Sequence, residues 1–117
     1  MKHITIVLLF LASFSVHSQS MNKKPNVIDQ EKIIVYGSDS CHYCIDTKAY
    51  LKEKNIAFIY FDIDLHKARE TEMIEKLTKA NISLSSLNLP VIDNKGDIFL
   101  NTGNFEEFLK VLYTKTK

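Results

Sequence analysis

The sequence has few residues of the types that mark several specialised classes of protein. Its 117 residues include three glycines, two prolines, two cysteines and no tryptophan. It has neither a glycine-rich phosphate-binding loop nor a GxSxG motif, so it supports neither a phosphate-binding enzyme nor a serine hydrolase. An excess of charge of one sign is also lacking. The formal net charge is +1, so the sequence does not indicate a nucleic acid or an anionic membrane as partner.

The first residues differ in character from the rest of the chain. Residues 1–18 begin with a basic residue, Lys2, continue with an apolar stretch and end in small polar residues. This is the layout of a secretory signal peptide, and the apolar stretch is shorter than the about 20 residues of a membrane-spanning helix. We expect cleavage after Ser18, or after Ser20, and an exported (periplasmic or secreted) protein without stable membrane contact. An uncleaved N-terminal anchor is the alternative.

The remaining chain divides into a polar N-terminal arm, residues 19–31, and one domain, residues 32–117. Hydrophobic residues make up 45% and charged residues 25% of the whole chain, as in ordinary globular proteins. Apolar runs rich in β-branched and aromatic residues predict strands, and amphipathic runs predict helices. The predicted elements are a strand at 32–37, a helix at 38–55, a strand at 56–64, a helix at 66–81, a loop at 82–88, a strand at 89–92, a turn at 93–96, a strand at 97–100 and a helix within 101–117.

This order of elements predicts an α/β fold. The first two strands are joined through a helix and should be parallel, with a right-handed crossover, whereas the last two are joined by a tight turn and should be antiparallel. We therefore expect a four-stranded mixed sheet, order β-α-β-α-β-β-α, flanked by three helices, with the first two strands fully buried. The residues expected on the inner faces of the helices are Ile45, Ala49, Leu51, Met73, Leu77, Ala80, Phe105, Phe108, Leu109, Leu112 and Tyr113.

The two cysteines, Cys41 and Cys44, lie three positions apart between the first strand and the first helix. Such a pair is a redox centre, half of a metal site or a structural staple. At a helix N-terminus, backbone N–H groups and the helix dipole favour a thiolate and lower a cysteine pKa. Cys41 would then attack a substrate disulfide, and the more buried Cys44 would resolve the mixed disulfide. The product is a Cys41–Cys44 disulfide.

The two other interpretations of the pair have less support. A disulfide between residues so close in sequence stabilises a fold little by chain entropy. A structural zinc site needs four ligands, and the chain has no second CxxC. After signal cleavage only His42 and His66 remain as imidazole ligands. We therefore predict no metal site.

From Lys32 to about Tyr113 the chain resembles the glutaredoxins, within the thioredoxin-like superfamily. The resemblance rests on CHYC between a strand and a helix, on LPVI at 89–92, on TGNF at 102–105 and on the order of the elements. It implies a thioredoxin-like fold of the glutaredoxin type. A thioredoxin-like binding module without catalytic turnover is the alternative within the same fold.

The resemblance also implies a substrate site. Leu89–Pro90 would be a cis peptide bond facing the Cys41 sulfur, and the backbone of Leu89 would pair with an extended substrate strand. The N–H groups before the last helix would receive a carboxylate, and an aromatic ring between the cysteines would pack on the substrate. The substrate-binding residues implied in this way are Tyr43, Leu89, Pro90, Gly103 and Asn104.

The sequence departs from the glutaredoxin pattern at several positions. His42 replaces the usual proline, and when protonated it would stabilise the Cys41 thiolate and make the protein more oxidising; the alternative is a solvated histidine without effect. Ser38 replaces a lysine that many glutathione-using members carry, and Asn104 replaces the second of two glycines. Lys48 would add positive potential near the cysteines or would be merely solvated. Protein thiols thereby become expected partners beside glutathione.

Together these features predict an exported, monomeric, glutaredoxin-like thiol–disulfide oxidoreductase. It would exchange electrons between its own dithiol and glutathione mixed disulfides or protein disulfides. No bound cofactor is needed, and glutathione is a candidate co-substrate. The sequence does not indicate the direction of electron flow, the redox potential or the physiological electron partner.

Overall fold

The computed structural model of the chain describes residues 32–117. The expected signal peptide, its cleavage sites and the polar arm lie outside these described residues. Within them the order of elements is the predicted one, with one added turn of 3-10 helix. The elements are β1 (Ile33–Gly37), α2 (His42–Glu53), β2 (Phe58–Asp62), α3 (Lys67–Lys79), η1 (Leu84–Ser86), β3 (Val91–Asn94), β4 (Asp97–Leu100) and α4 (Phe105–Thr116).

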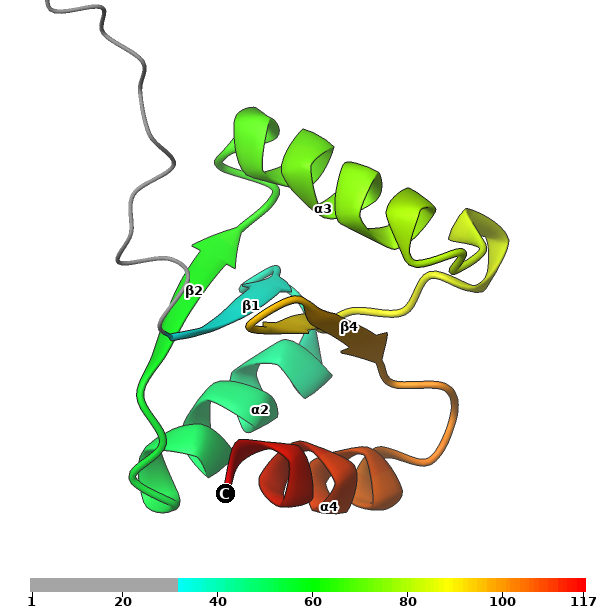
Figure 1. The fold of residues 1–117 in the computed structure, drawn as a ribbon. Helices are drawn as coiled ribbons and strands as arrows, with labels where there is room; N and C mark the ends of the chain where they lie inside the picture. Colours follow the sequence, from blue (N-terminus) through cyan, green and yellow to red (C-terminus); the bar gives the residue numbers. More distant parts are fainter. Residues whose placement is uncertain (1–31) are drawn as a thin grey trace, which may run out of the picture.

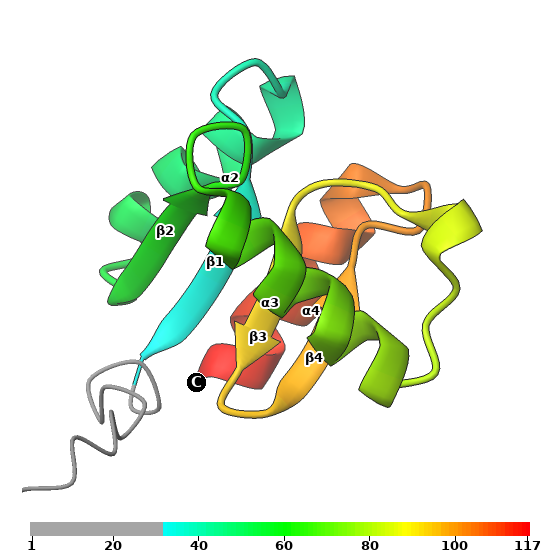
Figure 2. The same cartoon turned by 90° about the horizontal axis from the view of Figure 1, so that it is seen from above.

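The four strands form one mixed sheet in the order β2-β1-β3-β4. β1 pairs parallel to β2 and antiparallel to β3, and β3 pairs antiparallel to β4. The hairpin between β3 and β4 turns at Lys95 and Gly96, both with positive φ (53° and 99°), as a tight hairpin turn of the I′ type requires. Helix α3 covers one face of the sheet, and α2 and α4 cover the other (Figures 1 and 2). This confirms the thioredoxin-like α/β fold.

The central strand β1 divides the core into two layers. All five of its residues are buried, as expected for a strand covered on both faces. Ile34 and Tyr36 point toward α3, while Ile33 and Val35 point toward α2 and α4. Because side chains alternate along a strand, one short apolar run supplies both layers.

Strand β2 and the inner face of α2 differ from expectation. β2 is half-buried along its length, because it lies at the edge of the sheet. In α2, Ile45 and Ala49 are exposed, and the stripe that packs inward consists of Cys44, Thr47 and Leu51. These three residues are spaced i, i+3 and i+7, so they share one face of the helix, and the helical phase outweighs the hydrophobicity of Ile45.

The remaining corrections are shifts of element ends. Helix α2 begins at His42 rather than at residue 38, and Ala80 is the exposed C-cap of α3 rather than a core residue. β3 begins after the proline, and the stripe on α4 is buried at Phe108 and Leu112 but exposed at Tyr113.

Within residues 32–117, no helix has the length and apolar character needed to cross a membrane.

Candidate functional site

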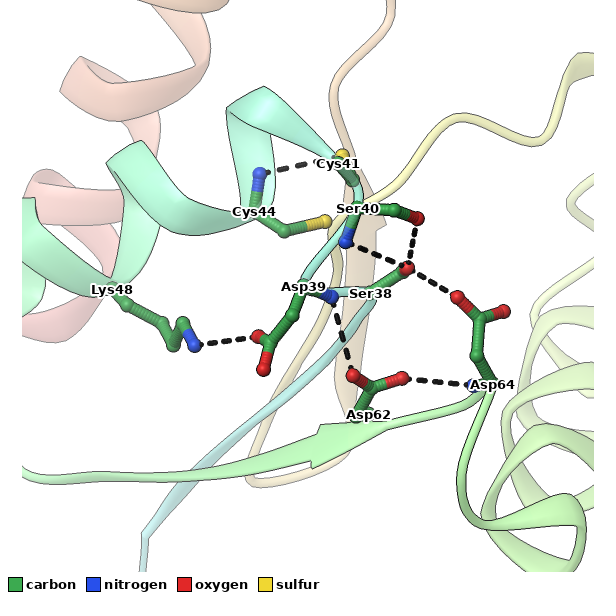
Figure 3. Close-up of polar contacts among 8 residues, drawn as sticks. All are labelled: Ser38, Asp39, Ser40, Cys41, Cys44, Lys48, Asp62 and Asp64. Atoms are coloured by element: carbon green, nitrogen blue, oxygen red, sulfur yellow. Dashed lines mark hydrogen bonds and ion pairs between the residues drawn. The ribbon is translucent and has the colours of Figure 1, made fainter.

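The two cysteines lie where the C-terminal end of β1 meets the N-terminus of α2 (Figure 3). Cys41 is the N-cap of α2, and its Sγ accepts a hydrogen bond from the backbone N–H of Cys44 at 3.4 Å. Its own N–H donates to the Ser38 carbonyl at 2.9 Å, which closes the loop before the helix. The structure therefore holds the Cys41 sulfur at a helix N-terminus, a place that favours negative charge.

The two sulfurs differ in their access to solvent. Cys41 is partly exposed, whereas Cys44 is fully buried, and both are free thiols. Burial raises the pKa of the Cys44 thiol to about 12, and the neighbouring Cys41 adds to the rise. A backbone hydrogen bond from Ser38 and the positive charge of Lys48 act in the opposite direction. This arrangement is an accessible sulfur in front of a protected one.

Gly37 leaves the space that the buried sulfur occupies. A Cβ placed on Gly37 would lie 2.9 Å from Cys44 Sγ and 2.9 Å from Cε2 of Tyr60, closer than side-chain carbons approach. The sequence pattern marks Gly37 only as the end of the predicted strand at 32–37. The feature of the sequence that could have indicated its contact with the dithiol is its position four residues before Cys41.

The segment before β3 lies against the dithiol. The Leu89–Pro90 peptide bond is cis, the form that the resemblance implied, and Pro90 is buried. The Cys41 thiol lies 3.8 Å from the Leu89 carbonyl oxygen, to which it donates a weak hydrogen bond. Because β3 pairs with β1, residues 48 positions apart in the chain meet at this point.

Ser38 is buried and ties the loop before Cys41 to the end of β2. Its hydroxyl donates to the Asp64 carboxylate and shares a hydrogen bond of 2.7 Å with the Ser40 hydroxyl (Figure 3). The Asp62 carboxylate accepts from the N–H groups of Asp39, at 3.2 Å, and Asp64, at 2.9 Å. Where many glutathione-using relatives would have a lysine, this chain has a hydroxyl that binds a carboxylate.

Lys48 is not a merely solvated lysine. Its Nζ lies 2.8 Å from Asp39 Oδ1 and 3.9 Å from the centroid of the Tyr60 ring, and its side chain is 24% exposed. The hydrogen bond from Lys48 lowers the pKa of the Asp39 carboxyl. Within residues 32–117 the Tyr60 hydroxyl is the buried side-chain oxygen that makes no hydrogen bond of good geometry, although it faces the Asp39 carboxylate. Burial, reinforced by the nearby Asp39 carboxylate, raises the pKa of Tyr60.

His42 and Tyr43 lie on the exposed first turn of α2. The His42 side chain is 81% exposed, and its Nε2 lies 2.9 Å from an oxygen of Asp46, one turn along the helix. Tyr43 is 45% exposed, and its ring packs against Phe105 of α4 with centroids 4.6 Å apart and the ring planes tilted by 33°. Phe105 was predicted as a core residue, and its ring also forms part of the surface beside the dithiol.

The contact of Tyr43 with Phe105 brings the N-terminus of α4 next to α2. Asn104 is the N-cap of α4, and its side chain accepts a hydrogen bond from the Glu107 N–H at 3.1 Å. Gly103 has a φ of 141°, and its N–H donates to Oδ1 of the buried Asn101 at 3.1 Å. The Gly103 N–H is therefore already engaged, and no pattern in the sequence pointed to Asn101.

The described part of the chain does not bring a metal-ligand set together. Among residues 32–117, no group of three or more histidine, cysteine, aspartate or glutamate side chains converges on one point. The zinc interpretation of the pair thus gains no further ligands from the fold.

Comparison with known proteins gives one family. The glutaredoxin family model matches residues 33–96 of the chain. The search of curated proteins found no match to the chain.

Solved structures resemble the chain along most of its length. Glutaredoxin 1 from Francisella tularensis, solved in complex with cacodylate, is 27% identical, with a TM-score of 0.51 over 72% of this chain and 93% of that one. A point mutant of the thioredoxin-like protein BC3987 is 25% identical, with a TM-score of 0.52 over 69% of this chain and 99% of that one. A glutaredoxin from Archaeoglobus fulgidus shares the fold at 20% identity, with a TM-score of 0.53 over 76% of this chain and 96% of that one.

Proposed function

Since the chain belongs to the glutaredoxin family, we propose that it is a thiol–disulfide oxidoreductase whose reacting groups are Cys41 and Cys44. The observation that carries this proposal is the pairing of an accessible sulfur at a helix N-terminus with a fully buried sulfur one turn behind it. A structural disulfide would not need one accessible partner. A nucleophile that is later released by a second thiol does need one.

The reaction has two steps in the reducing direction. The Cys41 thiolate attacks one sulfur of a substrate disulfide, forms a mixed disulfide and releases the first substrate thiolate. Cys44 then loses its proton and attacks Cys41 Sγ, so that the second substrate thiolate leaves and takes up a proton. The protein dithiol loses two electrons and the substrate disulfide gains them. The reverse sequence oxidises a substrate dithiol.

The first step makes the second one easier. While Cys41 carries negative charge, that charge and the hydrogen bond between the sulfurs hold the proton on Cys44. Once Cys41 is part of a neutral mixed disulfide, both effects are gone. The buried thiol is thus protected until a substrate is attached, and it then ionises more readily.

The substrate is proposed to lie between the segment before β3 and the start of α4. Leu89 and Pro90 offer backbone groups beside Cys41, and Tyr43 offers an exposed ring. Gly103 and Asn104 offer the N-terminus of α4 to a carboxylate, although the Gly103 N–H would first have to leave Asn101. His42 remains the proposed tuning residue of the potential.

Both glutathione and protein thiols are proposed as partners. The carboxylate beside Ser38 and the Asp39–Lys48 pair favour protein substrates over glutathione, since they provide no free cation for the carboxylates of glutathione. We also propose export through residues 1–18, on the layout of that segment alone. Mass spectrometry of the mature N-terminus after secretion would test this, and an intact residue 1 would contradict it.

A neutral chromogenic disulfide, 4,4′-dithiodipyridine, tests the proposed activity directly. The reduced protein should release one thiopyridone rapidly, as Cys41 is modified, and a second one as Cys44 resolves the adduct. Cys41→Ser should abolish the rapid phase, and Cys44→Ser should release one equivalent and stop. Turnover of a glutathione mixed disulfide and of insulin then distinguishes the two substrate classes.

The alternative of a binding module predicts a different result. Such a protein would keep a stable disulfide or unreactive thiols and would show no turnover with either substrate. Equal reactivity of Cys41 and Cys44 toward the reagent would also contradict the proposed roles.

A further inference from the structure

Lys48 occupies a defined place behind the buried sulfur. It lies one turn after Cys44 on α2, on the same side of the helix, because residues four apart are neighbours on a helix surface. Its ammonium is 3.9 Å from the centroid of the Tyr60 ring. The Tyr60 ring edge and the Cys44 sulfur both approach Gly37 from the same side, since a Cβ there would lie 2.9 Å from each. Lys48, Tyr60 and Cys44 therefore form one continuous cluster.

The position of Lys48 is held by two partners from outside the helix. Asp39, in the loop after β1, accepts a hydrogen bond from Nζ at 2.8 Å, and the Tyr60 ring of the edge strand β2 lies beneath it. Asp39 is 63% exposed, whereas Lys48 is 24% exposed. Water therefore screens the negative charge of Asp39 more than the positive charge of Lys48, and Lys48 contributes a positive potential at the buried sulfur.

The second step of the proposed reaction needs such a field. Cys44 must carry a negative charge while it is fully buried. The titratable groups that face it are Cys41 and Lys48 on α2 and Tyr60 on β2, with Asp39 and Asp62 behind Tyr60. Cys41 is neutral in the mixed disulfide, and Tyr60 keeps its proton. Lys48 is the cation of this set.

We propose that Lys48 is a positioning residue for the resolving step: its ammonium, held by Asp39 and the Tyr60 ring, stabilises the Cys44 thiolate that attacks the mixed disulfide. This inference rests on the proposed function. It assigns Lys48 no role in the first step, in which Cys41 reacts at the surface. The exchange itself is unchanged: Cys44 Sγ bonds to Cys41 Sγ, the substrate thiolate leaves, and the proton lost by Cys44 ends on that thiolate or in water.

The two-phase reaction with 4,4′-dithiodipyridine separates the two steps in one experiment. In Lys48→Met the first phase should keep the wild-type rate at neutral pH. The second phase should slow by roughly three- to tenfold. A rise of one unit in the Cys44 pKa lowers the thiolate fraction tenfold, and the stronger nucleophilicity of the more basic thiolate offsets part of this loss. The reagent is uncharged, so it does not respond to the loss of a surface cation.

The pH profile distinguishes an electrostatic role from a structural one. The rate of the second phase should rise with pH in both proteins, and the profile of Lys48→Met should lie about one pH unit higher. Lys48→Arg should restore the wild-type profile. Lys52→Met, which removes an exposed lysine in the last turn of the same helix, is the matched control and should change neither phase. Lys48→Gln repeats the test if Lys48→Met does not fold.

The possible failures are distinct. If the wild-type protein shows no rapid first phase, the proposed function is wrong. If both phases occur and Lys48→Met and Lys48→Gln resolve at the wild-type rate throughout the pH range, the role of Lys48 is wrong and the proposed function stands. A slower second phase with an unshifted pH profile, or one that Lys48→Arg does not rescue, would also overturn the electrostatic role.

Discussion

Gly37 and Cys44 are in direct contact across the junction of β1 and α2. A Cβ at position 37 would lie 2.9 Å from the Cys44 sulfur and 3.0 Å from its Cβ. The depth at which the Cys44 sulfur is buried is therefore set by the absence of a side chain on the neighbouring strand. This contact makes residue 37 part of the candidate site, although it contributes no chemical group.

Gly37→Ala should destabilise the protein and disturb the resolving step. The new methyl group has to displace Cys44 or Tyr60, and over-packing of this kind costs about 1–3 kcal/mol. Urea denaturation measures the loss. The second thiopyridone phase should change, while the first phase persists. In a Cys44→Ala background, which lacks the sulfur, Gly37→Ala should cost measurably less; equal costs in the two backgrounds would show that the contact is not the cause.

Tyr60→Phe should leave the protein as stable as before or stabilise it by up to about 1 kcal/mol. The Tyr60 hydroxyl is buried and makes no hydrogen bond of good geometry, although it faces the Asp39 carboxylate. Its removal therefore relieves a desolvation penalty, and the ring beneath Lys48 is kept. Tyr36→Phe is the matched control, because the Tyr36 hydroxyl accepts from Lys76 at 2.7 Å. That change should cost about 1 kcal/mol. A loss for Tyr60→Phe as large as the loss for Tyr36→Phe would contradict this assignment.

Lys76→Met should loosen the attachment of α3 to the sheet. Lys76 Nζ lies 2.6 Å from the buried Asp93 and 3.7 Å from Glu72, one turn earlier on the same helix. Burial would lower the Lys76 pKa, yet the hydrogen bonds to Asp93 and Tyr36 raise it above its ordinary value. Because Lys76 is partly exposed, we expect a loss of about 1–3 kcal/mol in the free energy of unfolding.

Lys79→Met, an exposed lysine in the last turn of the same helix, is the control for Lys76→Met. It should change the free energy of unfolding by less than about 0.5 kcal/mol. Both variants should keep the two thiopyridone phases, since α3 lies on the face of the sheet opposite α2. Loss of the first phase in Lys76→Met, with the fold intact, would show that the two faces are coupled.

The stability of the protein should fall at alkaline pH in a way that depends on Cys44. Its pKa is raised from 9.0 to about 12 on folding, so between these values the unfolded chain has lost a proton that the folded protein keeps. Stability is therefore fully present below pH 9 and falls as the pH rises toward 12; at pH 9.5 this loss is about 1 kcal/mol. Tyr36, raised from 10.0 to about 12, adds a similar loss above pH 10.

Two serine variants isolate this contribution of Cys44. As the pH rises from 8 to 9.5, the free energy of unfolding of Cys41→Ser should fall by about 1 kcal/mol more than that of the double variant Cys41→Ser/Cys44→Ser, which has no thiol to titrate. Urea denaturation at each pH gives the comparison. If the free energy of unfolding depends on pH in the same way in both variants, folding does not protect Cys44 from ionisation.

His42→Ala should make the protein less oxidising, because it removes the ring that, when protonated, would stabilise the Cys41 thiolate. The effect should be small, about two- to fivefold in the equilibrium constant with glutathione, since His42 is 81% exposed and pairs with Asp46. Glutathione-buffer titration measures it, with Asp46→Asn as the control for the partner. An unchanged equilibrium constant would leave His42 as a solvated histidine without effect.

The sequence predicted the features that depend on local pattern. The order of the elements follows from hydrophobic periodicity, and so does the placement of Cys41 and Cys44 between the first strand and the first helix. Their redox roles stay a proposal. Ile45 and Ala49 were misjudged because hydrophobicity was weighed above helical phase, which places Cys44, Thr47 and Leu51 inside.

The features that were missed depend on contacts between distant parts of the chain. Ser38 meets Asp64 across 26 positions, and Lys76 meets Asp93 across 17. The half-exposure of β2 depends on its place at the sheet edge, which only the strand order reveals. Lys48 could be recognised as more than a surface lysine only once Tyr60 and Asp39 were seen on either side of it.

The antiparallel pairing of β1 with β3 has a consequence for molecules that are only partly folded. Cys41 and Leu89 come together only through this long-range pairing, whereas the spacing of the two cysteines is kept by α2 alone. A partially opened molecule in which β3 has separated from β1 would keep its dithiol but lose selectivity for what that dithiol encounters. Under the proposed function, selectivity among substrates therefore depends more strongly on complete folding than the reactivity of the thiols does.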